Sequence, residues 1–273
     1  ETYAACPFRF FLQHVLGLLP LKGPPLLASL STYEKKRLMV DLLSRMSRTR
    51  ETNGQKESGI LACAQDVFSR YASSLDEMFL EIETENVLEN IQYYLSAAWE
   101  KNALSFSHFK VKYKTGEKAP AIEVEATGKK VHFSGHFDCV HEKKDLDITE
   151  GIHYRLGKPY ARGKDDRFHG GEQIRLMVDL LALATLFPGR QARRSFYQYL
   201  GPNGILSETS FCGDDLERKR EALKTICTHI VYGIENGFFF AVPAPQKCRT
   251  CPYPEICGPV RYPLFEHKQD DPR

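Results

Sequence analysis

The spacing of apolar residues predicts helices in the first part of the chain and strands in the middle. Apolar residues recur at helical intervals in residues 5–16, and helical patterns dominate again from about residue 32 to residue 104. After Ser105 the period changes to two, with apolar and polar residues alternating in segments 106–114, 121–126 and 129–140. The sequence therefore predicts a helical part that is followed by a sheet.

A further alternating segment, residues 143–157, is predicted to continue the sheet. A charged loop over 158–171 follows it, and later segments predict a helix over 172–186, a strand over 195–200 and an amphipathic helix over 216–234. This order favours an α/β fold of mixed α+β type, in which helices flank a mixed β-sheet. We expect one domain over 1–273, with a helical part at about 28–105, a sheet core at about 106–200, and a C-terminal helix and cysteine loop at about 213–260.

Composition excludes several classes of protein. Of the 273 residues, 42% are hydrophobic and 26% are charged, which excludes disordered, collagen-like and coiled-coil chains. No apolar run approaches the ~18 residues that a membrane span needs. No leader pattern precedes the first helix, so we expect a cytoplasmic protein without a membrane partner. The net charge of +2 neither requires nor excludes nucleic acid.

Three of the eight cysteines crowd together near the C-terminus. Cys248, Cys251 and Cys257 lie within ten residues of one another in a segment rich in proline, which favours a tight loop. Three neighbouring thiolates need compensating positive charge, which a metal centre supplies. Cys6, beside Pro7, is the best candidate for a fourth ligand. A [4Fe–4S] cluster is the favoured centre, with structural zinc and free or redox-active thiols as the alternatives.

The other cysteines lie in apolar patterns. Cys63, Cys139, Cys212 and Cys227 are each expected to be core residues.

Two segments resemble a known family. Residues 6–17, CPFRFFLQHVLG, and residues 247–258, KCRTCPYPEICG, are similar to the two ends of the iron–sulfur nuclease domain of AddB-type helicase–nucleases, which are RecB-like members of the PD-(D/E)XK superfamily. The resemblance implies a restriction-endonuclease-like fold whose termini are joined by a cluster held by Cys6, Cys248, Cys251 and Cys257. It also implies a role in DNA repair or recombination. The partners would then be a DNA single strand or duplex end and a helicase part of the same or another polypeptide.

The resemblance also implies where a catalytic site would lie. Family members hydrolyse phosphodiesters with Mg²⁺ and use a Gly-x-x-Asp strand, an Asp-x-Lys strand and a helix glutamine. Here GHFD at 135–138 supplies Asp138, and Gln173 matches the glutamine, although Met177 stands where an aromatic residue is usual. The Asp-x-Lys positions are occupied by His153 and Arg155, which share one face of the predicted strand.

These replacements favour a degenerate site. Histidine is a poor ligand for Mg²⁺, and arginine stays charged and cannot act as a titrating base. We therefore expect a DNA-binding domain with impaired catalysis. Two readings retain metal chemistry: an active Mg²⁺- or Mn²⁺-dependent DNA exonuclease that uses Asp138 and Gln173, with Glu123 as a second metal carboxylate, and transition-metal binding by Asp138 and His153. A purely structural zinc-bound interaction module is a third alternative.

A basic loop follows the altered strand. Residues 155–167 carry several cationic side chains with an interleaved tyrosine, a composition that suits contacts with phosphates and stacking on single-stranded DNA. The candidates are Arg155, Lys158, Tyr160, Arg162 and Lys164. An ordinary solvated loop is the alternative. The same alternatives apply to a second basic group of Arg190, Arg193 and Arg194.

Overall fold

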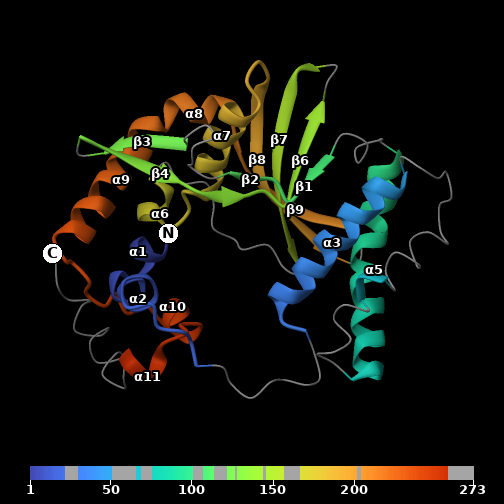
Figure 1. Cartoon of the computed structure of the whole chain (residues 1–273), viewed down its shortest axis with the longest axis horizontal. Coiled ribbons are helices and arrows are strands. Elements are labelled where there is room, and N and C mark those ends of the chain that lie inside the picture. Colours follow the sequence, from blue (N-terminus) through green and yellow to red (C-terminus); the bar gives the residue numbers. More distant parts are fainter. Residues whose placement is uncertain are drawn as a thin grey trace.

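A five-stranded mixed sheet forms the centre of the protein (Figure 1). The computed structural model describes residues 1–21, 30–50, 66–68, 76–100, 107–113, 122–126, 128–143, 146–156, 167–201 and 204–257. In spatial order the strands are β1 (Ser107–Phe109), β6 (Cys139–Lys143), β7 (Ile148–Leu156), β8 (Gln191–Gly201) and β9 (Gly204–Cys212). Only β7 and β8 pair in parallel, whereas the other neighbours are antiparallel.

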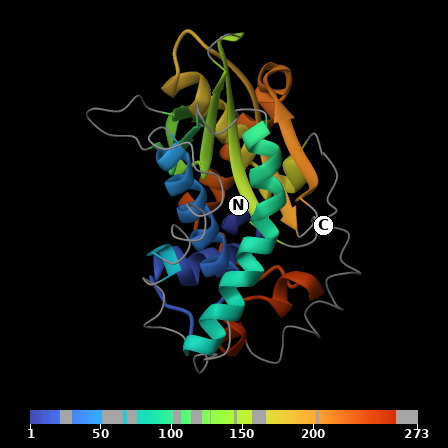
Figure 2. The same ribbon diagram turned by 90° about the vertical axis from the view of Figure 1, so that its right-hand side faces the viewer.

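Two long helices cover one face of the sheet. Helix α3 (Thr32–Arg50) packs on β1 and β7, and α5 (Glu77–Glu100) packs on β8 and β9. Figure 2 looks onto this side and shows α5 running in front of the strands. Apolar side chains of α3, such as Leu38 and Leu42, bury Ile152 and Tyr154 of β7. These are the helices that the pattern over residues 32–104 predicts.

The opposite face is covered by the helix that connects the two parallel strands. Helix α7 (Arg175–Leu186) follows the short α6 (Phe168–Gly171) and packs its apolar side chains against Phe137 and Val140. The helices α8 (Gly213–Arg218) and α9 (Arg220–Glu235) adjoin it. Helices on both faces of a mixed sheet confirm the predicted fold class. Within the described residues, no helix is both long and apolar enough to cross a membrane.

The alternating segment at 129–140 forms three strands, where the sequence predicts one. Strand β4 (Lys129–Phe133) pairs with β3 (Ile122–Ala126), β5 (Gly135–His136) pairs with β2 (Lys112–Tyr113), and only β6 joins the central sheet. The change of partner is completed at Asp138, whose N–H donates to the Ile152 carbonyl at 3.1 Å. Gly135 permits the close approach at β5, because a Cβ there would lie 2.4 Å from the Tyr113 hydroxyl.

Two features of the C-terminal half differ from the sequence analysis. The helix predicted over 216–234 is confirmed by α9 for most of its length, but its first turn belongs to α8, and the two helices meet at Lys219 in a non-helical conformation. The sequence does not predict strand β9, because its sequence GILSETSFC lacks a regular apolar alternation. Its pairing with β8 comes from tertiary context.

The two ends of the described chain are tied together. The N-terminal helices α1 (Thr2–Ala5), α2 (Pro7–Phe10) and the π-helix Phe11–Val15 lie beside the C-terminal α10 (Pro245–Arg249) and α11 (Pro254–Cys257) (Figure 1). Three hydrogen bonds join them: Tyr3 Oη to Phe238 O at 2.7 Å, Phe8 N to Phe240 O at 3.1 Å, and Tyr253 Oη to Leu18 O at 2.7 Å.

A partly buried histidine in β6, His141, predicts loss of stability in mild acid. Burial lowers the pKa of His141 from 6.5 to about 4, and the neighbouring charges that act on it are Glu150, Lys143 and Arg194. The unfolded chain therefore binds a proton between pH 6.5 and 4 that the folded chain does not. The contribution of neutral His141 to the free energy of unfolding is fully present above pH 6.5. It is lost as the pH falls through that window, by about 1–2 kcal/mol at pH 5. Urea unfolding at pH 7.5 and pH 5 measures the loss.

The substitution His141→Gln is the test of that assignment. In this variant the free energy of unfolding is expected to differ less between pH 7.5 and pH 5 than in the parent. His229→Gln, at an exposed position on α9, is expected to show the same difference as the parent. An equal acid loss in His141→Gln and the parent would contradict it.

Candidate functional sites

Asp138 is held in the gap between β5 and β6. Its side chain is almost fully buried and accepts a hydrogen bond from the Tyr154 N–H at 2.9 Å. The ammonium of Lys36, which projects from α3, lies 2.7 Å from Asp138 Oδ2. Because the chain changes strand partner here, the carboxylate faces neighbouring elements and not solvent.

The side chain of Asp138 stays ionised at neutral pH. Burial alone would raise its pKa, but the His153 ring and the Lys36 ammonium outweigh burial and hold the pKa at about 2. Burial also lowers the pKa of Lys36, against the opposing effect of Asp138, and the charges of Arg155 and Arg175 lower it further. The Asp138–Lys36 pair is therefore an internal ion pair in a region with several positive side chains.

His153 is oriented by a carboxylate on the crossover helix. The imidazole is fully buried, and its Nε2–H donates to Asp179 Oδ2 of α7 at 2.7 Å. The Tyr113 hydroxyl donates to the other oxygen of the same carboxylate at 2.6 Å. Burial and then the Asp179 charge raise the pKa of Tyr113, which keeps its hydroxyl protonated. Asp179 thus accepts two buried hydrogen bonds.

The structure brings Asp138 and His153 together, as the sequence predicts. His153 Nδ1 lies 3.8 Å from Asp138 Oδ2, and this nitrogen has no hydrogen-bond partner in the part of the chain that the structure describes. His136 stands on the other side, with its Nε2 3.8 Å from Asp138 Oδ1. The two imidazole rings lie 6.3 Å apart, nearly perpendicular to each other.

Two arginines border this group. The Arg155 guanidinium lies over the Tyr197 ring, 4.7 Å from its centroid, and that ring also contacts His153. Arg175, at the start of α7, donates to the His136 carbonyl at 3.1 Å. The surroundings of Asp138 are therefore positively charged, which suits an approaching phosphate.

The remaining predicted residues lie in other settings. Gln173 lies between α6 and α7, where its backbone N–H donates to the Phe168 carbonyl. Glu123 on β3 pairs with Lys130 at 2.9 Å and His132 at 3.1 Å, and its metal role stays a prediction. The predicted DNA contacts Lys158, Tyr160, Arg162 and Lys164 lie outside the described residues.

The second basic group does not form a separate cationic surface. Arg190 pairs with Glu142, and Arg194 Nε donates to Glu150 Oε1 at 2.8 Å. Arg193 lies 3.9 Å from the same Glu150 oxygen. These contacts favour a structural role for the three arginines over contact with nucleic acid.

Sequence reasoning missed several groups of the site. Asp179 carries a recognisable signal, because it is an acid in the otherwise apolar run LMVDLLALA of α7. No sequence signal marks Lys36, because it is one of two adjacent lysines on an amphipathic helix. Tyr113, His136 and Arg175 enter the site only through the strand pairings and the start of α7.

The group around Asp138 does not fit Mg²⁺. Magnesium prefers oxygen ligands in octahedral geometry, but the carboxylate of Asp138 is paired with Lys36 and that of Asp179 faces His153. Within the described ranges, no three His, Cys, Asp or Glu side chains form a group that holds a metal ion as they lie.

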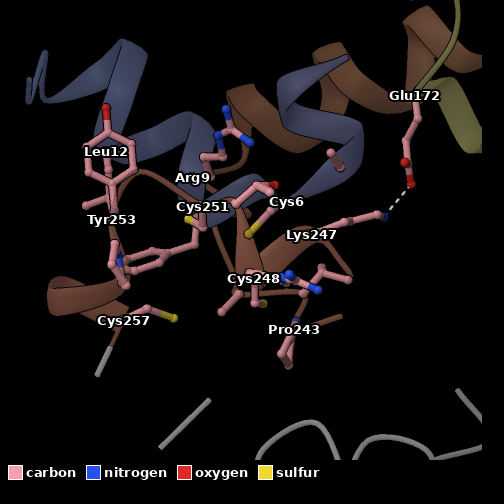
Figure 3. Close-up of a pocket in the computed structure, with 17 residues that line it drawn as sticks. Cys6, Arg9, Leu12, Glu172, Pro243, Lys247, Cys248, Cys251, Tyr253 and Cys257 are labelled. Carbon is pink, nitrogen blue, oxygen red and sulfur yellow. Dashed lines mark hydrogen bonds and ion pairs between the residues drawn. The ribbon is translucent and has the colours of Figure 1, made fainter. Parts of the chain in front are cut away.

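The four predicted cluster cysteines line one cavity. It has a volume of about 680 Å³ and lies between the N-terminal helices and the C-terminal loop. Figure 3 shows the labelled side chains of Cys6, Cys248, Cys251 and Cys257 around a common space. Cys6 comes from the extended residue between α1 and α2, and the other three come from the α10–α11 region. Residues separated by more than 240 positions therefore line the same cavity.

The chemistry of the cavity suits an anionic iron–sulfur centre. The three cations Arg9, Lys247 and Arg249 line it, and the Ala244 N–H donates to Cys248 Sγ at 3.4 Å. Arg9 Nε is buried and has no hydrogen-bond partner among the described residues. Positive charge and N–H donors beside the sulfurs are features that stabilise a cluster with thiolate ligands.

The cysteines outside the cavity differ in their exposure to solvent. Cys139 and Cys227 are buried, as the sequence predicts. Cys212 is exposed, so the core prediction is wrong there: the residue caps the N-terminus of α8, and its N–H donates to Asp215 Oδ2 at 2.9 Å. Cys63 lies outside the described residues.

One family model matches most of the chain. The family model described as "PD-(D/E)XK nuclease superfamily" matches residues 1–258. One similar solved structure, described as "Crystal structure of SSO0001", is 14% identical, with 93% of this chain and 95% of that chain covered and a TM-score of 0.34. No curated protein matches the sequence.

Proposed function

Because this chain belongs to the PD-(D/E)XK nuclease superfamily, we propose that it is a DNA-binding domain in which ordinary hydrolysis is lost. Its parent would be a helicase–nuclease-like protein of DNA repair or recombination that acts in the cytoplasm. The observation that carries the proposal is the identity and the burial of the residue at position 153. A histidine stands where a metal carboxylate is expected, and it is fully buried against Asp179.

Loss of hydrolysis follows from the chemistry of the groups present. Mg²⁺-assisted cleavage needs oxygen ligands for the ion and a group that steadies the attacking water. His153 offers a nitrogen ligand in place of a carboxylate oxygen. Arg155 stays charged, and its guanidinium lies over the Tyr197 ring. Asp138 remains, but one carboxylate that is paired with Lys36 makes a weak ion site.

Binding of DNA is supported by the charge around Asp138. Lys36, Arg155 and Arg175 surround the carboxylate, and the basic segment after β7 begins at Arg155. A phosphate backbone gains affinity from such side chains through the release of counterions. A single strand or a duplex end is the substrate class that we propose.

The proposal includes a [4Fe–4S] cluster bound by Cys6, Cys248, Cys251 and Cys257. It is supported by the shared cavity, the three cations that line it and the unpartnered Arg9 nitrogen. When bound, the cluster serves as a cross-link between the two ends of the domain. In this proposal the cluster and its thiolate ligands take no part in any reaction on DNA.

A second candidate function is an active Mg²⁺- or Mn²⁺-dependent exonuclease. The observation that favours it is Lys36, which places an ammonium 2.7 Å from Asp138 although the strand has lost its lysine. A lysine from α3 would then hold the attacking water. Asp138→Ala would abolish cleavage in that case.

The two candidates are separated by a binding and cleavage assay on labelled single-stranded and blunt-ended DNA. We expect tight binding in EDTA and intact DNA after incubation with Mg²⁺ or Mn²⁺. Cleavage that disappears in Asp138→Ala would establish the exonuclease instead. No binding to either DNA would contradict both.

The role of Arg155 in binding gives a further prediction. Arg155→Ala is expected to weaken binding to all DNA sequences alike and to reduce the slope of log K against log salt by about 1, because one phosphate contact is lost. Titrations at several salt concentrations measure that slope. The matched control is Arg220→Ala on the exposed side of α9, which leaves the slope unchanged. An unchanged slope in Arg155→Ala would rule out its contact with phosphate.

A further inference from the structure

We propose that Tyr33 of α3 stacks on an unpaired base of bound DNA, and that this contact makes the protein prefer single strands to fully paired duplex. The inference rests on the proposed function, because it names which of the two proposed forms of DNA is bound more tightly. It starts from an exposed aromatic ring on the helix that brings Lys36 to Asp138. The proposed iron–sulfur centre plays no part in it.

The first argument is the position of Tyr33 relative to the site. Tyr33 lies one helical turn before Lys36, and residues three apart in an α-helix have their Cβ atoms about 5–6 Å from each other on one face. The Lys36 ammonium lies 2.7 Å from Asp138 Oδ2, so this face of α3 is directed to the site. Lys36 is partly buried, whereas Tyr33 is 73% exposed. The tyrosine ring therefore borders the site on its solvent side.

The second argument is that this ring is available for stacking. Other rings near Asp138 are already in use: Tyr113 and Phe137 are buried, and the Tyr197 ring is covered by the Arg155 guanidinium at 4.7 Å from its centroid. Single exposed tyrosines are ordinary on protein surfaces. The position of Tyr33 beside a cationic group, and not its exposure alone, therefore favours a role in binding.

The third argument is that the two residues after Tyr33 are turned to other partners. The Ser31 N–H and hydroxyl donate to Glu34 Oε2 at 2.8 and 2.6 Å, which draws this carboxylate back to the start of α3. Lys35 Nζ lies 2.8 Å from Glu83 Oε2 of α5. The negative charge of Glu34 is thus held away from the face that Tyr33 shares with the site.

The charges that remain beside Tyr33 are positive. Lys36 and the exposed Arg37 lie three and four residues after Tyr33 and share its side of α3. Arg155 and Arg175 border the same site from β7 and from α7. A strand whose phosphates lie on these cations brings a base within reach of the ring. Cations that follow the backbone, together with an aromatic ring for a base, are typical of sites for single-stranded nucleic acid.

An unpaired base gains more from this ring than a paired base does. Bases inside a duplex already stack on their neighbours, whereas a base of a flexible single strand can turn its face to the tyrosine. One such stack changes affinity by about 5- to 150-fold, and it tolerates any base because every base has a π-face. The expected preference is therefore for single strands without a preference for sequence.

Fluorescence anisotropy with the full chain and a labelled oligothymidine strand tests the role of Tyr33. At one fixed salt concentration, Tyr33→Ala is expected to weaken binding at least about fivefold, whereas Tyr33→Phe keeps the ring and the parent affinity. A strand of the same length whose sugars carry no bases keeps the phosphates but cannot stack. The parent and Tyr33→Ala are expected to bind this base-free strand equally.

Two controls complete the experiment. The parent is expected to bind the oligothymidine strand more tightly than a blunt duplex of the same length, and Tyr33→Ala is expected to reduce that preference. Tyr232→Ala, at an exposed tyrosine of α9, is the matched control and keeps the parent affinity for each DNA. Because Tyr33 is 73% exposed, its variants are expected to fold as the parent does.

The outcomes separate this inference from the proposed function. If Tyr33→Ala binds oligothymidine as tightly as the parent, the inference is wrong and the proposed binding of DNA stands. An equal loss of affinity on the base-free strand would also overturn the inference, because no base would then be involved. A parent that binds none of these DNA molecules overturns the proposed function and the inference with it.

Discussion

Replacing Cys251 with serine is expected to strip the proposed iron–sulfur cluster and to detach the N-terminal helices from the C-terminal loop. The four cysteines of the cavity come from the two ends of the chain, so the proposed cluster would close a loop of more than 240 residues. A cross-link that closes a loop of this length stabilises the folded state by about 5 kcal/mol in the chain-entropy model. Iron and sulfide analysis with urea unfolding measures both effects.

The matched control is Cys212→Ser, at an exposed cysteine outside the cavity. It is expected to retain iron, sulfide and the brown colour of the anaerobically purified parent. A colourless parent that contains zinc would instead support the structural zinc module. A parent with neither metal would contradict the proposed centre.

The second large effect is expected at Asp179. Asp179→Ala leaves two buried donors, Tyr113 Oη and His153 Nε2, without their acceptor. A buried donor left without its acceptor costs about 1–3 kcal/mol, so two of them are expected to lower the free energy of unfolding by about 2–6 kcal/mol. Urea unfolding at pH 7.5 measures the loss.

Two variants separate this cause from a general effect of removing an acid. Asp179→Asn keeps one oxygen acceptor at the same place and is expected to recover part of the loss. Glu217→Ala, at an exposed acid of α8, is expected to change stability by no more than about 0.5 kcal/mol. An Asp179→Ala variant as stable as Glu217→Ala would show that the buried network does not support the fold.

The sequence predicts the sheet and its covering helices because each has a clear period. The alternation in β7 and the helical pattern of α3 and α5 are direct consequences of having one buried face. Period two does not say which strand is the partner, so the three-strand division of residues 129–140 could not be read from it. The same limit hides β9, whose apolar residues do not alternate.

The candidate site was predictable only in part. The positions of Asp138 and His153 are implied by the resemblance to the family's motifs, and strand pairing then brings them within 3.8 Å. Lys36 lies about a hundred residues earlier on another element, and nothing local distinguishes it from Lys35. Its approach to Asp138 depends on how α3 crosses the sheet, which is tertiary packing.

The pairing of the two chain ends also constrains how the protein is made. Tyr3 bonds Phe238, so the aromatic N-terminal helices leave the ribosome long before their partners are synthesised. Until then Tyr3, Phe10 and Phe11 lack the Phe239 ring on which they pack. Contacts of such long sequence separation form late and leave apolar surface open to aggregation in the meantime.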